Sequence, residues 1–168
     1  MIFKDTGCLV MKSSEIKSAE KPIPAPTGEQ THFPRRILVV DDDRDARQLT
    51  VDVLTSSGYE VEGVKDGAAG WAALQARHYD LIITDNRMPR MKGIEMIAKL
   101  RAASMTLPVI MATGLLPTHE FVRRPWLKPD ITLEKPFSND DLMEAVKTLL
   151  SSDDGRDDQK ESLLPKYL

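Results

Sequence analysis

The sequence predicts an α/β fold in which a doubly wound parallel sheet carries helices on both faces. Short apolar runs alternate with segments of helical periodicity five times along the chain. Most of these runs are continuous and rich in β-branched residues, which is typical of strands buried on both faces. Because crossovers between parallel strands are right-handed, the intervening helices can cover both faces of one sheet.

Length and composition favour one domain with two tails. Of the 168 residues, 41% are apolar, which is enough for one core. We expect a disordered, Pro-containing N-terminal tail at residues 1–34, the domain at residues 35–150 and an acidic C-terminal tail at residues 151–168. The second tail is too short for an output domain.

Charge and cysteine content restrict the class of protein. The net charge is −3 and the basic residues are scattered, so we expect no binding to nucleic acid. The single cysteine, Cys8, excludes an internal disulfide framework. No run approaches the roughly 20 apolar residues of a membrane span. The sequence therefore predicts a cytoplasmic protein with no membrane partner.

The first half of the domain begins with a buried strand at residues 37–40. A helix follows, whose inward positions recur at helical spacing and which Gly58 ends; these positions are Ala46, Leu49, Thr50, Val53 and Leu54. Residues 59–62 alternate in polarity like a more exposed strand. Asp66 is a suitable N-cap for a second helix that ends near Arg77.

The second half starts with a strand at residues 81–84 and a helix from Ile94 to about Ala103. Pro108 precedes a fourth strand. Prolines then limit the fourth helix to residues 118–123, because a proline costs a helix interior about 3 kcal/mol. A fifth strand is expected at residues 131–134. The last helix is capped by residues 138–141, and its apolar face consists of Leu142, Ala145, Val146 and Leu149.

Polar residues of different kinds follow four of the five strands. An acidic cluster at residues 41–43 follows the first, Asp85 the third, Thr113 the fourth and Lys135 the fifth. In an open parallel sheet, ligands bind outside the carboxyl ends of the strands. Carboxylates, a hydroxyl and an ammonium group would therefore converge on one surface, and this set suits a divalent cation and a phosphoryl group.

Three of these carboxylates, Asp41, Asp42 and Asp85, predict a metal site. Like charges at close range repel unless a cation intervenes. Mg²⁺ commonly takes one or two carboxylates together with phosphate oxygens and water. The backbone carbonyl of Arg87, two residues after Asp85, lies where it could add a ligand.

One carboxylate could also attack phosphorus, as in enzymes that form an aspartyl phosphate. Asp85 is the better candidate, because it stands alone at the tip of the central strand. Lys135 would balance the charge of the phosphoryl oxygens, and Thr113 would donate a hydrogen bond to them.

Each residue also has a simpler interpretation. Asp43 could be a solvated helix N-terminus, and Asp85 could cap a turn before Pro89. Thr113 could be an ordinary strand-end hydroxyl, and Lys135 a surface lysine. The combination of all of them at strand ends favours the functional interpretation.

Four motifs carry a resemblance to a known family. The segments at residues 36–43, 80–93, 108–114 and 134–137 closely resemble the receiver domain of two-component response regulators. The resemblance covers about residues 36–150. It implies a flavodoxin-like five-stranded sheet in the order 2-1-3-4-5, and a Lys135–Pro136 peptide bond that is often cis.

The resemblance also implies roles for individual residues. Asp85 would be the phosphoacceptor, Asp41 and Asp42 the acid pair that holds Mg²⁺, Thr113 the switch hydroxyl and Lys135 the phosphate-sensing lysine. A histidine kinase or a histidine phosphotransfer protein would be the phosphodonor. The chain would catalyse only its own phosphorylation and dephosphorylation, without turnover as an enzyme.

Some positions depart from the family pattern. Thr132 stands where receivers usually have tyrosine or phenylalanine, three residues before the lysine. Gly114 replaces a common alanine, and Lys92 a frequent aspartate. Arg87 and Leu115 occupy positions that tune the lifetime of the phosphate in the family. We therefore hypothesise that Arg87 alters autodephosphorylation.

The leading interpretation is a single-domain response regulator that signals through protein–protein contacts. Its partner surface is expected on the last two strands and helices, where Trp126 is either an interface anchor or a cover for the short fourth helix. A second interpretation is an interaction module of receiver fold that is not phosphorylated. A third is a phosphatase of the haloacid dehalogenase type, but such enzymes need an aspartate two residues after the nucleophile, where this chain has Arg87.

Overall fold

The computed structural model describes residues 34–151. The two predicted tails lie outside the described residues, except for residues 34 and 151. The elements follow one another as β1 (Arg36–Val40), α1 (Arg44–Ser56), β2 (Glu60–Val64), α2 (Gly67–Ala76), β3 (Leu81–Thr84), α3 (Gly93–Ala102), β4 (Val109–Thr113), α4 (Thr118–Arg123), the 3₁₀ helix η1 (Pro125–Leu127), β5 (Ile131–Glu134) and α5 (Asn139–Ser151). No helix within residues 34–151 is both long enough and apolar enough to cross a membrane.

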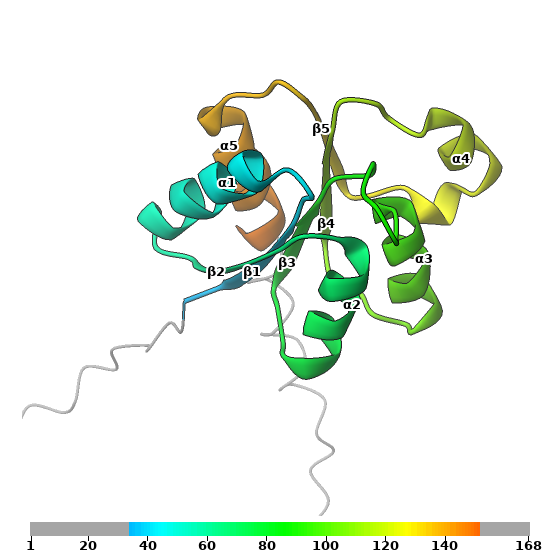
Figure 1. Ribbon diagram of the computed structural model, residues 1–168, viewed down its shortest axis with the longest axis horizontal. Coiled ribbons are helices and arrows are strands. Elements are labelled where there is room, and N and C mark those ends of the chain that lie inside the picture. Colours follow the sequence, from blue (N-terminus) through cyan, green and yellow to red (C-terminus); the bar gives the residue numbers. More distant parts are fainter. Residues whose placement is uncertain (1–33, 152–168) are drawn as a thin grey trace, which may run out of the picture. The chain divides into compact units, whose positions relative to one another are not determined.

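The five strands form one parallel sheet in the order β2-β1-β3-β4-β5. Helices α1 and α5 cover one face, and α2 and α3 cover the other, with α4 and η1 beside α3 (Figure 1). The predicted doubly wound α/β fold and its strand order are confirmed. The strands end together: Val40 pairs with Thr84, and Thr113 pairs with Glu134. Residues that follow the strands therefore lie along one edge of the sheet.

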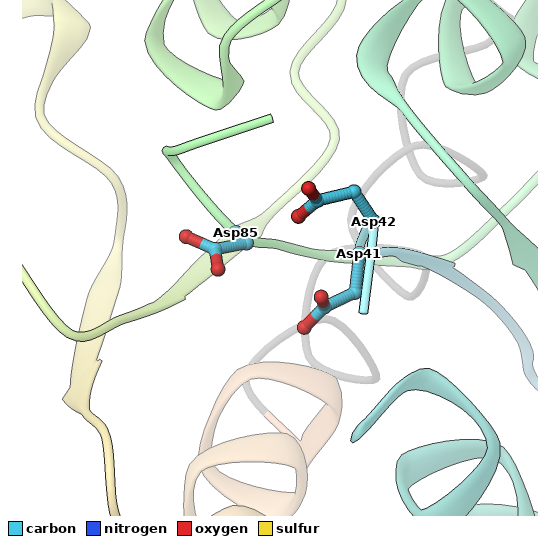
Figure 2. A group of neighbouring side chains, drawn as sticks. All are labelled: Asp41, Asp42 and Asp85. Carbon is cyan, nitrogen blue, oxygen red and sulfur yellow. The ribbon is translucent and has the colours of Figure 1, made fainter. Parts of the chain in front are cut away.

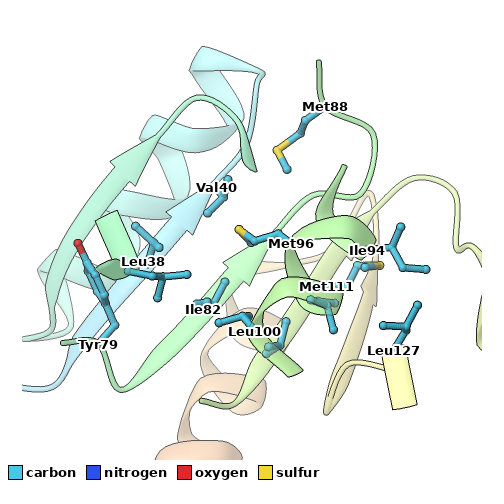
Figure 3. Close-up of a cluster of buried hydrophobic side chains, with 13 residues drawn as sticks. Leu38, Val40, Tyr79, Ile82, Met88, Ile94, Met96, Leu100, Met111 and Leu127 are labelled. Carbon is cyan, nitrogen blue, oxygen red and sulfur yellow. The ribbon is translucent and has the colours of Figure 1, made fainter. Parts of the chain in front are cut away.

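Two hydrophobic clusters lie on opposite faces of the sheet, because successive strand side chains point to opposite faces. The cluster under α2 and α3 includes Leu38, Val40, Ile82 and Met111 from the strands (Figure 3). The cluster under α1 and α5 includes Ile37, Val39, Ile83 and Ile110. From η1, Leu127 is only 2% exposed and completes the first cluster, so the short fourth helix region is still anchored to the core.

One predicted inward residue faces solvent. Leu49 of α1 is 59% exposed, whereas Leu54 at the other end of the same stripe is fully buried. Leu49 lies at the rim of a cavity between α1 and α5, where no side chain covers it. The prediction that Leu49 packs inward is therefore wrong.

Side-chain caps start three of the helices. Asp43 accepts hydrogen bonds from the N–H groups of Asp45 (2.9 Å) and Ala46 (3.1 Å) at the start of α1. Asp66 accepts one from Ala69 (2.9 Å) at the start of α2, as predicted. At α5, the Ser138 hydroxyl accepts from the N–H of Asp141, whose carboxylate accepts from the N–H of Ser138. These caps satisfy backbone donors that would otherwise be unpaired.

Candidate functional site

The register of the sheet places two aspartates beside each other. The N–H of Asp85 donates to the carbonyl of Val40 (2.9 Å), and the N–H of Asp41 donates to that of Val64 (3.1 Å). Both residues thus continue the hydrogen-bond ladder one step beyond their strands. Asp42 comes next on the chain, and carboxylate oxygens of Asp41, Asp42 and Asp85 lie within 4.8 Å of one another (Figure 2).

Lys135 lies between two of these carboxylates. Its Nζ is 2.6 Å from Oδ2 of Asp41 and 3.1 Å from Oδ2 of Asp85. Its backbone N–H donates to the carbonyl of Thr113 (3.1 Å), which fixes the start of the loop after β5. The Lys135–Pro136 bond is cis, as the family resemblance predicted. The structure therefore brings Asp41, Asp42, Asp85 and Lys135 together.

The two carboxylate oxygens of Asp85 have different neighbours. Oδ1 accepts hydrogen bonds from the backbone N–H groups of Asn86 and Arg87, the latter at 3.0 Å. Oδ2 faces Lys135. The carboxylate therefore caps the turn after β3 and also points into the acidic cluster, so the simpler interpretation and the functional one both describe part of the geometry.

The environment keeps Asp85 ionised. Burial opposes the charge, but hydrogen bonds from the Arg87 backbone, the Thr113 hydroxyl and Lys135 outweigh it, and the pKa of Asp85 lies below its usual value. For Asp41, burial dominates and raises the pKa despite the hydrogen bond from Lys135. Burial also opposes the charge of Lys135, but its bonds to both carboxylates raise its pKa. The ammonium group therefore stays charged, and Asp41 remains incompletely stabilised as an anion.

The donor set fits a hard divalent cation. Three carboxylates meet at this point. The ammonium group of Lys135 bonds to two of them, those of Asp41 and Asp85. All the donors are oxygens, which is the chemistry that Mg²⁺ prefers. A dication bound by Asp41, Asp42 and Asp85 would remove their mutual repulsion. The role of the Arg87 carbonyl as a further ligand stays a prediction.

Thr113 is fully buried at the end of β4. Its Oγ1 accepts from the N–H of Leu115 (3.4 Å) and lies 3.5 Å from the carbonyl oxygen of the same residue. The hydroxyl of Thr113 thus contacts the loop before α4. Thr132, at the usual aromatic position of receivers, is exposed on β5.

Sequence reasoning missed residues that shape the loop after Asp85. Asn86 is buried, and its Oδ1 accepts from the N–H of Ile94 (3.2 Å). The N–H of Gly93 donates to the carbonyl of Asn86 (3.2 Å), so the loop closes on the first turn of α3. The side chain of Arg90 in this loop pairs with Asp66. Only the polar character of these positions is visible in the sequence, because their partners depend on the fold.

Two hollows lie next to the acidic cluster. A cavity of about 480 Å³ lies between α1 and α5; it is mainly apolar, and Leu49, Phe137 and Leu142 line it together with Asp85 and Lys135. A second cavity, of about 490 Å³, lies between the loops that follow β3 and β4. Its lining consists of Asp42, Asn86, Arg87, Met88, Pro89, Lys92, Leu115, Leu116 and Pro117.

Comparisons with known proteins agree with this geometry. A family model described as the response regulator receiver domain matches residues 37–147. The chain is 35% identical over 128 residues to the response regulator MprA of Mycobacterium sp. (strain KMS), covering 74% of this chain and 56% of that protein. It is 33% identical over 115 residues to the probable transcriptional regulatory protein SilR of Salmonella typhimurium, covering 68% and 50%. The chain thus spans about half the length of these relatives.

Solved structures show the same likeness. The chemotaxis response regulator CheY4 of Vibrio cholerae has a TM-score of 0.64 and 30% identity, covering 70% of this chain and all of that one. The response regulator TrrA of Thermotoga maritima, solved in complex with Mg(2+)-BeF, has a TM-score of 0.62 and 32% identity, covering 69% and 99%. With the family match over residues 37–147, these findings show that the chain belongs to the response regulator receiver domain family.

Proposed function

We propose that Asp85 accepts a phosphoryl group from a histidine kinase or a histidine phosphotransfer protein, in a reaction that depends on Mg²⁺. The observation that carries this proposal is the position of the Asp85 carboxylate, 3.1 Å from Lys135 and grouped with Asp41 and Asp42. The Mg(2+)-BeF complex of the related TrrA supports it. The acidic cluster would hold the metal, which would supply positive charge to the phosphoryl oxygens.

The residues around Asp85 have separate tasks in the proposed transfer. Oδ2 of Asp85 forms the new P–O bond while the bond between phosphorus and the donor's histidine nitrogen breaks, and the histidine leaves as imidazole. Lys135 balances the charge of the phosphoryl oxygens, and the Thr113 hydroxyl donates a hydrogen bond to them. The N–H groups that bind Oδ1 hold the nucleophile in one orientation. We propose that the chain has no further catalytic turnover.

The donor is proposed to approach over α1. Leu49 is a large apolar side chain, 59% exposed, at the rim of the cavity that reaches Asp85 and Lys135. An apolar helix face carrying a histidine would cover Leu49 and place its phosphoryl group at Asp85. Large apolar residues that are exposed beside a reactive group favour a protein donor.

The output surface is proposed to include α4 and η1. Phosphorylation adds a charge of about −1.5 to −2, and the contact between Thr113 and Leu115 links the site to the loop before α4. Val122 and Trp126 are 80% and 63% exposed, whereas Leu127 anchors the segment in the core. This supports Trp126 as an interface anchor, because Leu127 already provides the covering role.

A second candidate, a receiver-fold interaction module without phosphorylation, is favoured by one observation. Thr132, which has no aromatic ring, occupies the position that is usually aromatic in receivers, on an exposed part of β5. The phosphatase interpretation has less support, because the residue two positions after Asp85 is Arg87, which cannot act as a carboxylic acid. The single-domain character and the expected absence of nucleic-acid binding stay predictions, since the relatives are about twice as long.

The test is the formation of an acyl phosphate with acetyl phosphate and Mg²⁺, followed by transfer from kinases of the same cell. Wild type should gain a hydroxylamine-sensitive phosphate that Asp85→Asn lacks. Asp140→Asn is the matched control, because Asp140 is an exposed carboxylate at the start of α5. No label on the wild type from any donor would leave the interaction module as the function, and equal labelling of Asp85→Asn would exclude Asp85 as acceptor.

A further inference from the structure

The polar contacts of the loop after the phosphoacceptor, residues 86–92, are mainly short-range. Asn86 and Arg87 donate to Asp85, and the N–H of Met91 donates to the carbonyl of Pro89 (2.7 Å). The N–H of Lys92 donates to Glu95 in the first turn of α3 (3.0 Å). These contacts define the internal shape of the loop and join it to α3, and the buried side chain of Met88 anchors it in the core.

One ion pair joins this loop to a distant element. Among the described residues, one polar side-chain contact connects residues 86–92 with a residue outside the segment 85–95. It is the ion pair between Arg90 and Asp66. Asp66 is fully buried and also caps α2 through the N–H of Ala69 (2.9 Å). One carboxylate therefore holds both the start of α2 and the loop that carries Arg87.

The backbone of Arg90 adopts a conformation that is unusual for a residue with a side chain. Arg90 has φ of 66°, in the left-handed region. Glycine adopts this conformation freely, whereas a residue with a Cβ atom does so at a cost. Arginine at this position thus disfavours the turn locally, and the contact with Asp66 offsets that cost.

The start of α2 also touches the loop directly. A Cβ atom on Gly67 would lie 2.7 Å from the carbonyl oxygen of Met91 and 3.1 Å from its Cβ. The backbones of α2 and of the loop are therefore packed without space for a methyl group. A loop released from Asp66 could not move toward α2 and would shift away from it, changing the position of the Arg87 backbone.

We propose that Arg90 and Asp66 are positioning residues that hold the loop carrying Arg87 in register with the acidic cluster. They do not touch the reacting atoms. This inference rests on the proposed function, because its consequence is the affinity for Mg²⁺ and the rate of phosphorylation at Asp85. It assigns to α2 a part in the site that the acidic cluster alone does not reveal.

Arg90→Gly separates positioning from folding. Glycine relieves the left-handed backbone, which offsets part of the stability lost when the buried Asp66 carboxylate loses its cationic partner, and circular dichroism verifies that the variant is folded before binding is measured. The dissociation constant for Mg²⁺, measured by calorimetry on the folded protein, should increase about tenfold, as when residues that support metal ligands are changed. Phosphorylation by acetyl phosphate at subsaturating Mg²⁺ should slow by the same factor and recover at saturating Mg²⁺.

Ser104→Gly is the matched control. Ser104 has φ of 56° and is exposed after the end of α3, away from the loop at residues 86–92. It gives the same relief of a left-handed backbone without removing a contact to Asp66. Its Mg²⁺ affinity should equal that of wild type.

Asp66→Asn tests the partner, because asparagine keeps the N-cap of α2 but loses the charge. Asp66→Asn and Arg90→Gly should each weaken Mg²⁺ binding, and the double variant should be no weaker than the weaker single one. Arg90→Lys should restore part of the affinity. Wild-type affinity in Arg90→Gly, or additive losses in the double variant, would overturn the proposed positioning role. Failure of the wild type itself to bind Mg²⁺ and to be labelled would instead overturn the proposed function.

Discussion

Gly93→Ala is a sharp test of how the site is built, because it adds one methyl group where two backbones meet. Gly93 is the first residue of α3, and its N–H donates to the carbonyl of Asn86. A Cβ atom on Gly93 would overlap the carbonyl oxygen of Asp85 and lie 3.1 Å from the Cα of Asn86. No rotamer can relieve this clash, since all the atoms involved belong to the backbone or to Cβ.

The expected effect is large. Relief of the overlap requires the turn after β3 and the start of α3 to separate by on the order of 1 Å, in a packed region that deforms little. Overpacking of this kind costs about 3 kcal/mol. With a urea slope of roughly 1.5 kcal/mol per M, the unfolding midpoint falls by about 2 M. Because Asp85 moves with its carbonyl, phosphorylation that depends on Mg²⁺ should also be lost.

The assay is urea unfolding followed by circular dichroism, with Gly114→Ala as the control. Around Gly114 a Cβ atom would meet no atom within 4 Å, so the same methyl group finds open space. That variant should keep or gain about 0.5 kcal/mol, through the lower entropy of its unfolded chain. A Gly93→Ala protein within about 0.5 kcal/mol of wild type would refute the packing argument.

Three further predictions follow from the geometry. Mg²⁺ at about 100 times its dissociation constant should raise the unfolding free energy by about 2.7 kcal/mol. Asp42→Asn should remove most of this gain. A rise in melting temperature that a chelator does not reverse would contradict binding of the metal at this site. The hydroxyl of Tyr79 is buried and donates to Glu62 (2.6 Å), and burial raises the pKa of Tyr79 to about 12. The folded protein therefore keeps this proton, whereas the unfolded chain loses it above about pH 10. The free energy of unfolding has its full value below pH 10 and falls by on the order of 2 kcal/mol toward pH 12. Tyr79→Phe should lack this pH-dependent part of the unfolding free energy when unfolding is measured between pH 9 and pH 11. Leu127→Ala should cost about 2–5 kcal/mol and Trp126→Ala less than about 1 kcal/mol in urea unfolding, and equal losses would show that the exposed ring has a structural role.

The main elements of this fold were predictable from local patterns. Continuous β-branched runs identified the inner strands, and the prolines around α4 predicted its bounds, Thr118–Arg123. Asp66 was recognisable as the cap of α2. The meeting of the strand-end residues was predictable because parallel strands share one carboxyl edge, and pairing of Val40 with Thr84 makes the residues after them neighbours. Boundaries differed by a residue or two, as at the end of α2.

Other features depend on contacts between distant segments. The periodicity of α1 marks Leu49 and Leu54 as equivalent, but Leu54 lies under the packed part of the helix and Leu49 lies at the rim of a cavity. In the loop after Asp85, nothing in the sequence pairs Arg90 with Asp66, 24 residues earlier. Buried Asn86 resembles any loop asparagine until the start of α3 provides its donor. Such partners follow from how elements pack, and single-chain periodicity does not encode them.

The two hollows next to the acidic cluster differ in chemistry, and this difference matches the two steps of the proposed signal. The cavity between α1 and α5 is mainly apolar and reaches Asp85 on the side of Lys135, which suits a protein donor that must exclude water during transfer. The hollow between the loops is lined by Arg87, Lys92 and Leu115, and the N–H of Leu115 donates to the Thr113 hydroxyl. A phosphoryl group on Asp85 adds negative charge, which Lys135 meets on the donor side and the cations Arg87 and Lys92 meet on the loop side. In the proposed mechanism, donor recognition and response therefore use different surfaces, and we expect a partner that reads the phosphorylated state to bind after the donor has left.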